Sequence, residues 1–300
     1  MSSAISVVIP AHNAGRTIGM SLRHLQDELW PDDELFVVDD GSTDDTASLA
    51  QSLGACVIPT GTSGSVGNAR NLGWNAATRP HVVFLDADAI VEPGWRQGVA
   101  RATDEFAGSA VGCARGLVGR NAWSWVAQLQ VGTPWLATGS PRPARTLPSF
   151  CLVVPRELPV RWDVTFGGED GLFAADLLSC GVTLVFDPRF AARHEEYRDT
   201  FAQVRTWHRR LVYGMARCGP VQREGRYKRM LTRVPVHFFL LARLPRMYMR
   251  LRKDAAARRL FLRLLPWMIV AEWSLGVAAL RYAASRRPPL RTASRVSAAS

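Results

Sequence analysis

The chain has 300 residues, of which 47% are hydrophobic and 21% are charged, and this composition is that of a folded globular protein with a hydrophobic core. Its five cysteines lie far apart without a C-x-x-C pair, which argues against a zinc cluster and a disulfide framework and favours a reducing compartment. The first residues, Met1 to Ala4, carry no positively charged segment, so no signal peptide is expected.

The formal net charge of +11 is unevenly distributed along the chain. Residues 1–192 carry 13 basic and 20 acidic side chains, whereas residues 193–300 carry 24 basic and 6 acidic ones. Nearly all of these basic side chains are arginines. A strongly basic C-terminal third indicates an anionic partner, either a nucleic acid or an anionic membrane surface.

Strands and helices alternate over the first 90 residues. Short apolar runs predict strands, and each of the first three is followed by a loop and by apolar residues at helical spacing. The alternation predicts an α/β fold with a parallel sheet covered by helices on both faces, in which ligands bind beyond the carboxyl ends of the strands. The expected strands are residues 5–9, 34–38, 56–58 and 82–85, and the expected helices are 18–29, 44–54 and 68–77.

A polar segment follows each of these four strands, so four candidate binding segments converge on one crevice. The segments are Pro10, Ala11, His12 and Asn13; Asp39 and Asp40; the loop of Gly61, Gly64 and Gly67 with Arg70 behind it; and Asp86, Ala87 and Asp88. The glycine loop matches neither the dinucleotide pattern nor the P-loop pattern, so it is either a connector or a phosphate contact. Arg70 is the better candidate to meet a phosphate, with an ordinary surface arginine as the alternative.

The fourth strand ends abruptly in Asp86 and Asp88. Carboxylates at the end of a buried strand are costly without partners, which makes a divalent cation a natural occupant. The alternative is that both acids merely precede the next helix, beside Glu92 and Pro93.

The chain between residues 106 and 200 is less regular, and we expect it to form the second wall of the cleft. Glu169 and Asp170 follow two glycines and open an amphipathic helix, where the helix dipole explains one acid but does not require two. His194 lies on an exposed-looking segment and is either a structural histidine or a metal ligand. Strands are expected at 110–114, 149–154 and 182–186, a helix at 123–126 and a loop at 140–143.

Five motifs in this order resemble those of the family 2 glycosyltransferases, which are inverting enzymes of the GT-A fold. They are Ser6 to Asn13, Val37 to Asp44, Asn68 to Gly73, Phe84 to Asp88 and Gly168 to Asp170. The resemblance implies a Rossmann-like, mostly parallel sheet with helices on both faces, in a catalytic domain at residues 1–200. Residues 1–105 would be the nucleotide-sugar-binding half and 106–200 the acceptor-side half. The Q-x-x-R-W signature of processive polymerases is out of register at Gln203, so processive synthesis is not expected.

The resemblance also implies roles for individual positions. Those that would contact the nucleotide sugar are Pro10, Ala11, His12, Asn13, Asp40, Arg70, Asp86 and Ala87. Among them, Asp40 would reach the base, Arg70 the phosphates and Asp86 the ribose. Asp88 and His194 would hold Mn²⁺ or Mg²⁺. Asp170 would be the catalytic base, with Gly168 and Glu169 beside it on the acceptor side.

These residue types suit the chemistry independently of the resemblance. A nucleoside diphosphate gains negative charge as it leaves, and a divalent ion stabilises that charge. On the opposite face of the sugar, a carboxylate must take the proton of the attacking hydroxyl. The predicted function is therefore metal-dependent, inverting transfer of a sugar from a nucleotide-diphosphate sugar to an acceptor hydroxyl. The alternatives are a nucleotidyltransferase of nucleotide-sugar metabolism and a non-catalytic basic nucleic-acid-binding protein.

Residues 201–285 are expected to form a basic, apolar helical region that associates with a membrane. Trp267 and Trp273 are aromatic residues of the kind favoured at a bilayer interface, and arginines flank the apolar stretches. The run Leu264 to Leu280 is short for a spanning helix and is interrupted by Glu272. We therefore expect this region at the cytoplasmic face of the cell membrane, peripheral or with a single pass. The alternative is a set of helices packed on the catalytic domain with a solvated basic face.

A membrane surface suggests a lipid-linked or cell-envelope glycan as the acceptor. The expected partners are therefore the nucleotide sugar, this acceptor and an anionic membrane surface, and no specific nucleic acid is expected. A helical stretch is expected at residues 230–241. Residues 286–300 are rich in arginine, proline, serine and alanine and are expected to be a disordered tail.

Overall fold

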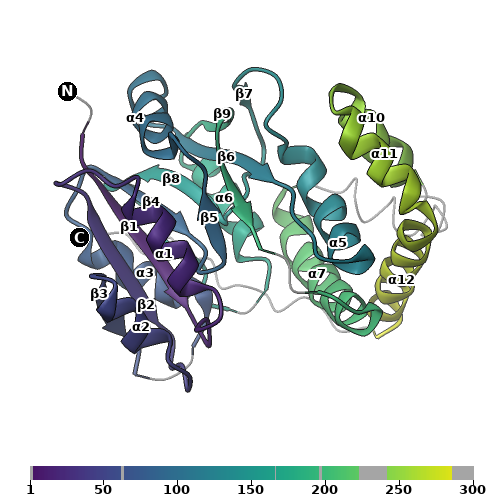
Figure 1. Ribbon diagram of the computed structural model, residues 1–300, viewed down its shortest axis with the longest axis horizontal. Coiled ribbons are helices and arrows are strands. Elements are labelled where there is room, and N and C mark those ends of the chain that lie inside the picture. The colour runs from purple at the N-terminus through teal and green to yellow at the C-terminus, as the bar shows by residue number, and fades with distance from the viewer. Residues whose placement is uncertain (1–2, 62–63, 166, 196–197, 223–241, 286–300) are drawn as a thin grey trace.

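The computed structural model describes residues 3–61, 64–165, 167–195, 198–222 and 242–285 (Figure 1). The helical stretch expected at 230–241 and the tail expected at 286–300 lie outside the described residues. Within them, one sheet runs through the molecule in the order β3-β2-β1-β4-β8-β6-β9-β5, and β7 pairs with β9. Helices cover this sheet on both faces, as the sequence predicts.

The first four strands and their helices match the expected elements closely. The parallel order β3-β2-β1-β4 follows from three strand–helix–strand units, each of which returns the chain to the same end of the sheet. All four strands therefore end at one edge, where the polar segments follow. The elements are β1 (Ile5–Ala11), α1 (Ile18–Gln26), β2 (Glu34–Asp39), α2 (Thr46–Ser52), β3 (Cys56–Pro59), α3 (Val66–Ala76) and β4 (His81–Leu85).

Beyond β4 the sheet becomes mixed, because β8 inserts antiparallel between β4 and β6. Among the described strands beyond β4, parallel pairing occurs only between β6 and β9, so the mostly parallel arrangement holds for the N-terminal part of the sheet. The elements are β5 (Ala89–Val91), α4 (Trp95–Glu105), β6 (Ala110–Gly116), α5 (Ala122–Gly132), the 3-10 helix η1 (Thr133–Trp135), β7 (Arg142–Pro143), β8 (Cys151–Pro155), α6 (Glu169–Ser179) and β9 (Leu184–His194).

Two expectations in this half were wrong. Arg142 and Pro143 form a short strand rather than a loop, because they pair with Phe186 and Val185 of β9. The strand expected at 182–186 does not end before Pro188 but continues to His194. Its register against β6 shifts between Cys113 and Ala114, and this irregularity accommodates the proline.

The core lies in two layers, one on each face of the sheet. Alternate residues of β1 point to opposite faces, so Val7 and Ile9 join one layer and Val8 joins the other. Helices α1, α2 and α4 cover the first layer, and α3 and α6 cover the second. Gly73 of α3 lets that helix approach β1 closely, because a Cβ atom there would lie 2.2 Å from Val8 Cγ1.

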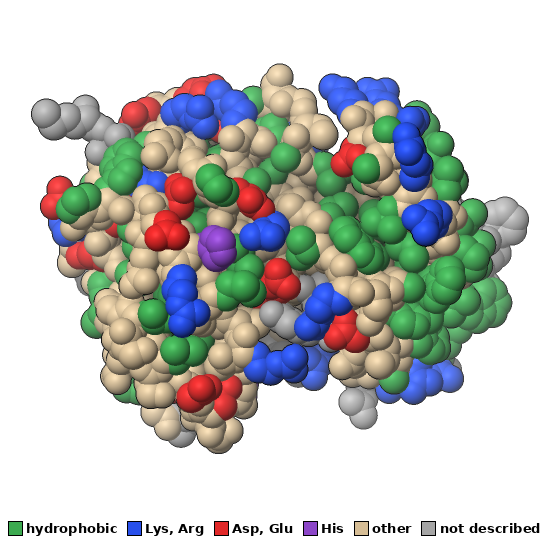
Figure 2. Space-filling view, in the orientation of Figure 1, with side chains coloured by type: hydrophobic (Ala, Val, Ile, Leu, Met, Phe, Trp, Pro, Cys, Tyr) green, Lys and Arg blue, Asp and Glu red, His purple; other side chains and the backbone are tan. Residues whose placement is uncertain are grey.

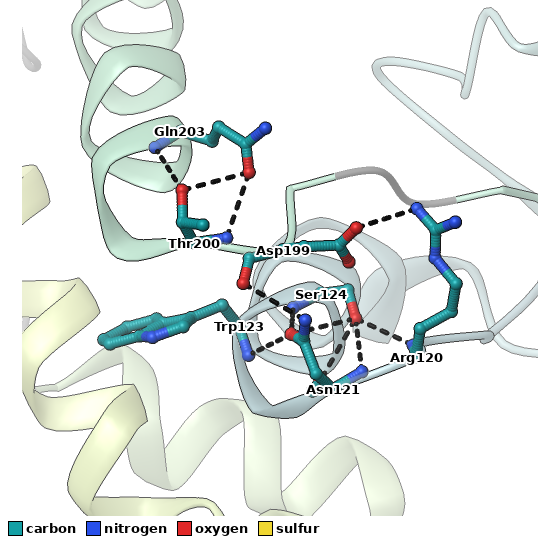
Figure 3. Close-up of polar contacts among 7 residues, drawn as sticks. All are labelled: Arg120, Asn121, Trp123, Ser124, Asp199, Thr200 and Gln203. Carbon is teal, nitrogen blue, oxygen red and sulfur yellow. Dashed lines mark hydrogen bonds and ion pairs between the residues drawn. The ribbon is translucent and has the colours of Figure 1, made fainter.

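Helices α5 and α7 (Phe201–Gln222) begin next to each other and are tied together (Figure 3). Asn121 caps α5 through the backbone amides of residues 123 and 124. Thr200 and Gln203 cap α7 reciprocally. Asp199 links the two starts, since its carboxylate accepts from Arg120 at 2.9 Å and its carbonyl accepts from Asn121 at 3.1 Å. The two helices therefore leave the sheet as a pair, and Gln203 serves as a capping residue.

The C-terminal helices pack on this pair. They are α10 (Arg243–Arg250), the 3-10 helix η2 (Leu251–Lys253), α11 (Ala255–Arg263) and α12 (Leu265–Ala284). Glu272 of α12 is fully buried, accepts from Gln130 of α5 at 2.9 Å and pairs with Arg243 at 3.3 Å. His208 of α7 completes the network with contacts to Gln130 and Ser274. The acid that interrupts the apolar run thus faces the protein.

No single described helix has both the length and the apolar composition to cross a bilayer. Helices α11 and α12 meet those criteria only as a pair, which is bent by 71° at the break between them.

Replacing Gly73 with alanine should destabilise the protein by about 1–3 kcal/mol, because the added methyl group must displace Val8 in a packed core. Urea unfolding measures the change. Asn75→Ala, at an exposed position of the same helix, is the matched control and should be neutral or slightly stabilising. Equal stability of the two variants would contradict the close packing of α3 on β1.

Candidate active site

Two acids and one histidine meet at the carboxyl edge of the sheet. Asp86 and Asp88 occupy the turn between β4 and β5, and His194 is the last residue of β9, which pairs with Ala89. His194 Nε2 lies 3.3 Å from Asp88 Oδ1 and 3.6 Å from Asp86 Oδ2. Two backbone hydrogen bonds of 2.9 Å fix the turn: the Asp86 N–H donates to the Phe150 carbonyl, and the Glu195 N–H donates to the Asp88 carbonyl.

The three side chains fit a divalent cation. Their ligand atoms lie within 4.8 Å of one another, and two carboxylates with one imidazole are ligands that divalent metal ions accept. The buried Nδ1 atom of His194 has no hydrogen-bond partner among the described residues. The expectation that His194 lies on an exposed segment was wrong, because the end of β9 carries it into the site, where it is only partly exposed.

Protein contacts separate the proton affinities of the two acids. Burial would raise the pKa of Asp86, but its contact with His194 and the charge of Arg70 outweigh burial and hold that pKa far below the usual range. Burial raises the pKa of Asp88, and the nearby charge of Asp86 adds to the effect. Asp86 therefore stays ionised under more acidic conditions than an ordinary aspartate, whereas Asp88 takes up a proton more readily unless a cation binds it.

Arg70 joins this cluster to Asp170. Its side chain is only 2% exposed, so it is not the surface arginine that remained as an alternative. Nη2 donates to Asp86 at 2.9 Å, and Nη1 lies 3.5 Å from Asp170 Oδ1. Burial lowers the pKa of Arg70, but the charges of Asp86, Asp170 and Glu169 reverse this and raise it.

Asp170 stands at the start of α6 with 48% of its side chain exposed, so a substrate can reach it. Desolvation by the surrounding protein raises the pKa of Asp170, although Arg70 and a hydrogen bond from Ser149 oppose the shift. Burial and the neighbouring Asp170 also raise the pKa of Glu169. Gly168 before it has φ +81°, and a Cβ atom there would lie 2.7 Å from Gly214 O of α7, which explains the glycine.

Arg217 of α7 fixes the loop that leads to Asp170. Its buried guanidinium donates to Asp163 Oδ1 and Thr165 Oγ1, each at 2.9 Å, and to the carbonyl of Gly167. Burial alone would raise the pKa of Asp163, but hydrogen bonds from Thr165 and Arg217 outweigh it and lower that pKa. The position of Asp170 therefore depends on helix α7, which follows the last strand of the sheet in the chain.

The Trp162 ring packs against the guanidinium group of Arg70. The guanidinium carbon of Arg70 lies 4.3 Å from the centroid of the Trp162 ring, which itself stacks on Phe173. Asn71 of α3 exchanges two hydrogen bonds of 2.9 Å with the backbone of Trp162. Helix α3, which carries Arg70, is thereby joined to the segment before Asp170.

The loops after β1 and β2 form one hydrogen-bonded unit. His12 Nδ1 lies 2.9 Å from the carbonyl oxygen of Asp40, and Asn13 Oδ1 accepts from the backbone N–H of Thr43 at 2.8 Å. The buried Asp40 carboxylate accepts from Thr60 and from the Gly64 amide, each at 3.0 Å. Asp40 thus anchors the glycine loop through Thr60 and Gly64. Nothing in the sequence indicated this contact.

The structure places the predicted residues in two neighbouring groups on one edge of the sheet. Asp86, Asp88, Asp170 and Arg70 come together with His194, and Glu169 adjoins Asp170. The second group follows β1 and β2 and consists of Pro10, Ala11, His12, Asn13 and Asp40, among which Ala11 is buried and offers mainly its backbone. Ala87, between Asp86 and Asp88 in the chain, packs against the core.

Sequence reasoning missed Trp162 and Arg217. Trp162 lies in an irregular stretch, and Arg217 is one arginine among many in its helix. A single sequence carries no signal for either, because their roles arise from contacts between distant segments.

Comparisons with known proteins agree with this geometry. Residues 6–152 match the sequence profile described as "Glycosyl transferase family 2". Glycosyltransferase GlyG of Streptococcus pneumoniae is 31% identical over 97 residues, which cover 31% of this chain and 32% of that protein. An uncharacterised glycosyltransferase of Mycobacterium tuberculosis, Rv0539, is 34% identical over 130 residues, which cover 43% and 56%. These alignments span between about a third and just over half of the relatives' length.

Solved structures show the same fold. A mannosyltransferase from Pyrobaculum calidifontis, PcManGT, solved with GDP-Man and Mn²⁺, superposes with a TM-score of 0.62 at 19% identity over 96% of this chain and 89% of that chain. TarS 1–349 of Staphylococcus aureus, solved with UDP-GlcNAc, gives a TM-score of 0.54 at 15% identity over 94% and 92%. At these identities the likeness establishes the fold, which is GT-A as expected.

Changing Asp88 to asparagine should weaken Mn²⁺ binding at least about tenfold, because a metal ligand is lost while the turn keeps its backbone hydrogen bonds. Titration followed by electron paramagnetic resonance measures free Mn²⁺. Wild-type affinity should fall as the pH is lowered toward the raised pKa of Asp88, since the ligand must lose its proton. Asp32→Asn, at an exposed position, is the control, and equal binding by both variants would remove Asp88 from the metal site.

Proposed function

Because this chain is a family 2 glycosyltransferase, matched over residues 6–152, we propose that it transfers a sugar from a nucleotide-diphosphate sugar to an acceptor hydroxyl in a metal-dependent, inverting reaction. The acceptor that we propose is a lipid-linked or cell-envelope glycan. The observation that carries the proposal is the bridge formed by Arg70 between Asp86 of the Asp86–Asp88–His194 cluster and Asp170.

The cluster and Asp170 suit the two charges that such a reaction creates. A divalent ion, Mn²⁺ or Mg²⁺, held by Asp88 and His194 would neutralise the negative charge that develops on the diphosphate leaving group. Asp86 keeps its negative charge through Arg70 and can accept hydrogen bonds from donor hydroxyls. Pro10, Ala11, His12, Asn13 and Asp40 border the same edge and would take the nucleoside.

Asp170 has the exposure and the proton affinity of a general base. Its exposed carboxylate can accept the proton of an acceptor hydroxyl as the oxygen attacks the sugar, and its raised pKa makes it a better proton acceptor than an ordinary aspartate. A single displacement with this base inverts the anomeric centre and requires no second carboxylate as nucleophile. Gly168 and Glu169 would border the acceptor beside it.

The C-terminal helices support a membrane-bound acceptor. Helix α12 buries one face against α5 and α7 and exposes an apolar face on the other side, where Trp273 is 60% exposed. Figure 2 shows hydrophobic side chains gathered over this part of the molecule, with Lys and Arg side chains at its border. An exposed apolar face beside arginines suits the anionic inner leaflet, so the cytoplasmic face of the cell membrane is the proposed location. The exposed residues are Leu262, Trp267, Ile269, Val270, Trp273 and Leu280.

Asp170→Asn should lower kcat about 10²- to 10⁴-fold, because the amide cannot accept the hydroxyl proton. Transfer is measured with Mn²⁺ and a panel of UDP-, GDP- and dTDP-sugars, and donor binding should be nearly unchanged. Asp176→Asn, at an exposed position of the same helix, is the matched control. Full activity of Asp170→Asn would refute the role of Asp170, and a product that retains the donor's anomeric configuration would refute inversion.

The pH profile provides a second readout for the same role. Since the base works only when ionised and its pKa is raised, wild-type activity should fall on acidification at a higher pH than an ordinary aspartate would cause. A profile without an acid limb in that range would exclude Asp170 as the titrating base.

Changing Trp267 and Trp273 to alanine should weaken binding to anionic vesicles at least about tenfold, because each indole contributes apolar surface that the bilayer would bury. Cosedimentation measures the bound fraction. Met20→Ala with Leu178→Ala removes two exposed hydrophobic side chains elsewhere and should leave binding unchanged. Failure of the wild type to sediment with anionic vesicles would end the membrane proposal.

A further inference from the structure

A basic cleft lies away from the candidate active site, between the η1–β7 segment and the end of α10. Its volume is about 640 Å³. Figure 2 shows the surface notched between the part over β7 and the part over α10, with Lys and Arg side chains on the α10 side. The side chains that matter for its chemistry are Thr133, Arg142, Arg145, Arg250, Arg252 and Lys253.

The cleft carries positive charge that the described chain does not neutralise. Five cationic side chains line it, and the described lining residues include no acid. From residue 242 to the C-terminus the sequence contains only two acids, Asp254 and Glu272. Asp254 caps α11 by accepting from the Ala257 amide at 2.9 Å, and Glu272 is buried in its own network. The cleft therefore offers an anion five cations and, among the described lining residues, no competing acid.

The arginines repel one another in this arrangement. Burial lowers the pKa of Arg250, and the positive charges of Arg243, Arg246 and Arg142 lower it further. Burial also lowers the pKa of Arg142. An anion between the walls would relieve both costs, because it attracts the same charges that repel one another.

One wall is organised before any ligand arrives. The Arg142 guanidinium lies 4.2 Å from the centroid of the Phe186 ring and donates to the Pro134 carbonyl at 2.9 Å, so its plane is fixed. Thr133, which lines the cleft, is 2% exposed, and its hydroxyl has no hydrogen-bond partner among the described residues. A guanidinium held by these two contacts presents its remaining N–H donors to tetrahedral oxygens.

The cleft is separate from the metal-side cluster. Arg142 pairs with Phe186 of β9, whereas His194 ends the same strand eight residues later. Because β9 bulges between Asp187 and Ala191, Phe186 pairs with Gly112 of β6 and Arg193 with Gly116, so at about 3.3 Å per residue the two backbone positions lie roughly 15 Å apart. The described residues that line the cleft include neither Asp86 nor Asp88 nor His194, so the cleft is distinct from that cluster.

We infer that this cleft binds phosphate groups, as a phosphate ester or diphosphate held by Arg142, Arg145 and Arg250. Guanidinium groups pair with phosphate oxygens through two parallel hydrogen bonds, which suits several arginines around one small volume. The ligand chemistry is that of a lipid headgroup or of a soluble phosphate ester. This inference does not rest on glycosyl transfer and stands or fails separately from it.

Inorganic pyrophosphate, titrated calorimetrically into the full chain in the presence of EDTA, tests the inference without metal at the other site. The wild type should bind, and Arg142→Gln with Arg250→Gln should weaken binding at least about tenfold. Arg259→Gln with Arg263→Gln removes the same charge from exposed positions of α11 and should change the affinity less than about threefold. Arg252→Gln with Lys253→Gln is a second cleft pair if the first pair proves unfolded by circular dichroism.

Two outcomes would overturn the inference. One is the absence of pyrophosphate binding to the wild type, and the other is equal weakening by the cleft pair and the α11 pair, which would indicate a nonspecific polycation. Competition then identifies the source of the phosphate. Displacement of pyrophosphate by phosphatidylglycerol-containing vesicles but not by pure phosphatidylcholine vesicles supports a lipid headgroup. Displacement by glycerol phosphate alone supports a soluble ester.

Discussion

The buried guanidinium of Arg70 is the interaction on which the cleft depends. A charge that is 2% exposed is tolerated only because Asp86 and Asp170 pair with it from two sides and the Trp162 ring lies against it. Without it, Asp86 and Asp170 would repel each other across the cleft. The same side chain therefore keeps Asp86 ionised on the metal side and holds Asp170 on the opposite side. The two walls of the site are joined through one cation.

How much the sequence reveals depends on how local the cause is. The strands of the N-terminal half and the polar residues at their ends were predictable, because apolar runs and loop residues act within a few positions. The antiparallel entry of β8 and the continuation of β9 to His194 were not, since each depends on pairing with strands distant in sequence. The sequence indicated that Arg70 meets phosphates. It did not indicate that Arg70 is buried between Asp86 and Asp170, because that burial depends on packing against Trp162, which is distant in sequence.

The matched family region and the complete site do not coincide. Residues 6–152 contain Asp86 and Asp88, but Asp170, His194 and Arg217 lie beyond that region.

Glu272 shows how the C-terminal helices are attached, because its contacts to Gln130 and Arg243 join α12 and α10 to α5. Burial raises the pKa of Glu272, so an acid at this position would destabilise an isolated apolar helix. In a helix that packs on the protein, the same acid favours the one orientation in which its partners are in reach.

Helix α7 has a neighbour of consequence on each side. On one side Arg217 holds the Gly167 carbonyl and Gly214 leaves room for Gly168, so the helix sets the position of the Asp170 loop. On the other side Val212 packs against Leu275 of α12. Helix α7 thus connects α12 to the loop that precedes Asp170. A displacement of α12 would therefore be transmitted to the neighbourhood of Asp170 through a single helix.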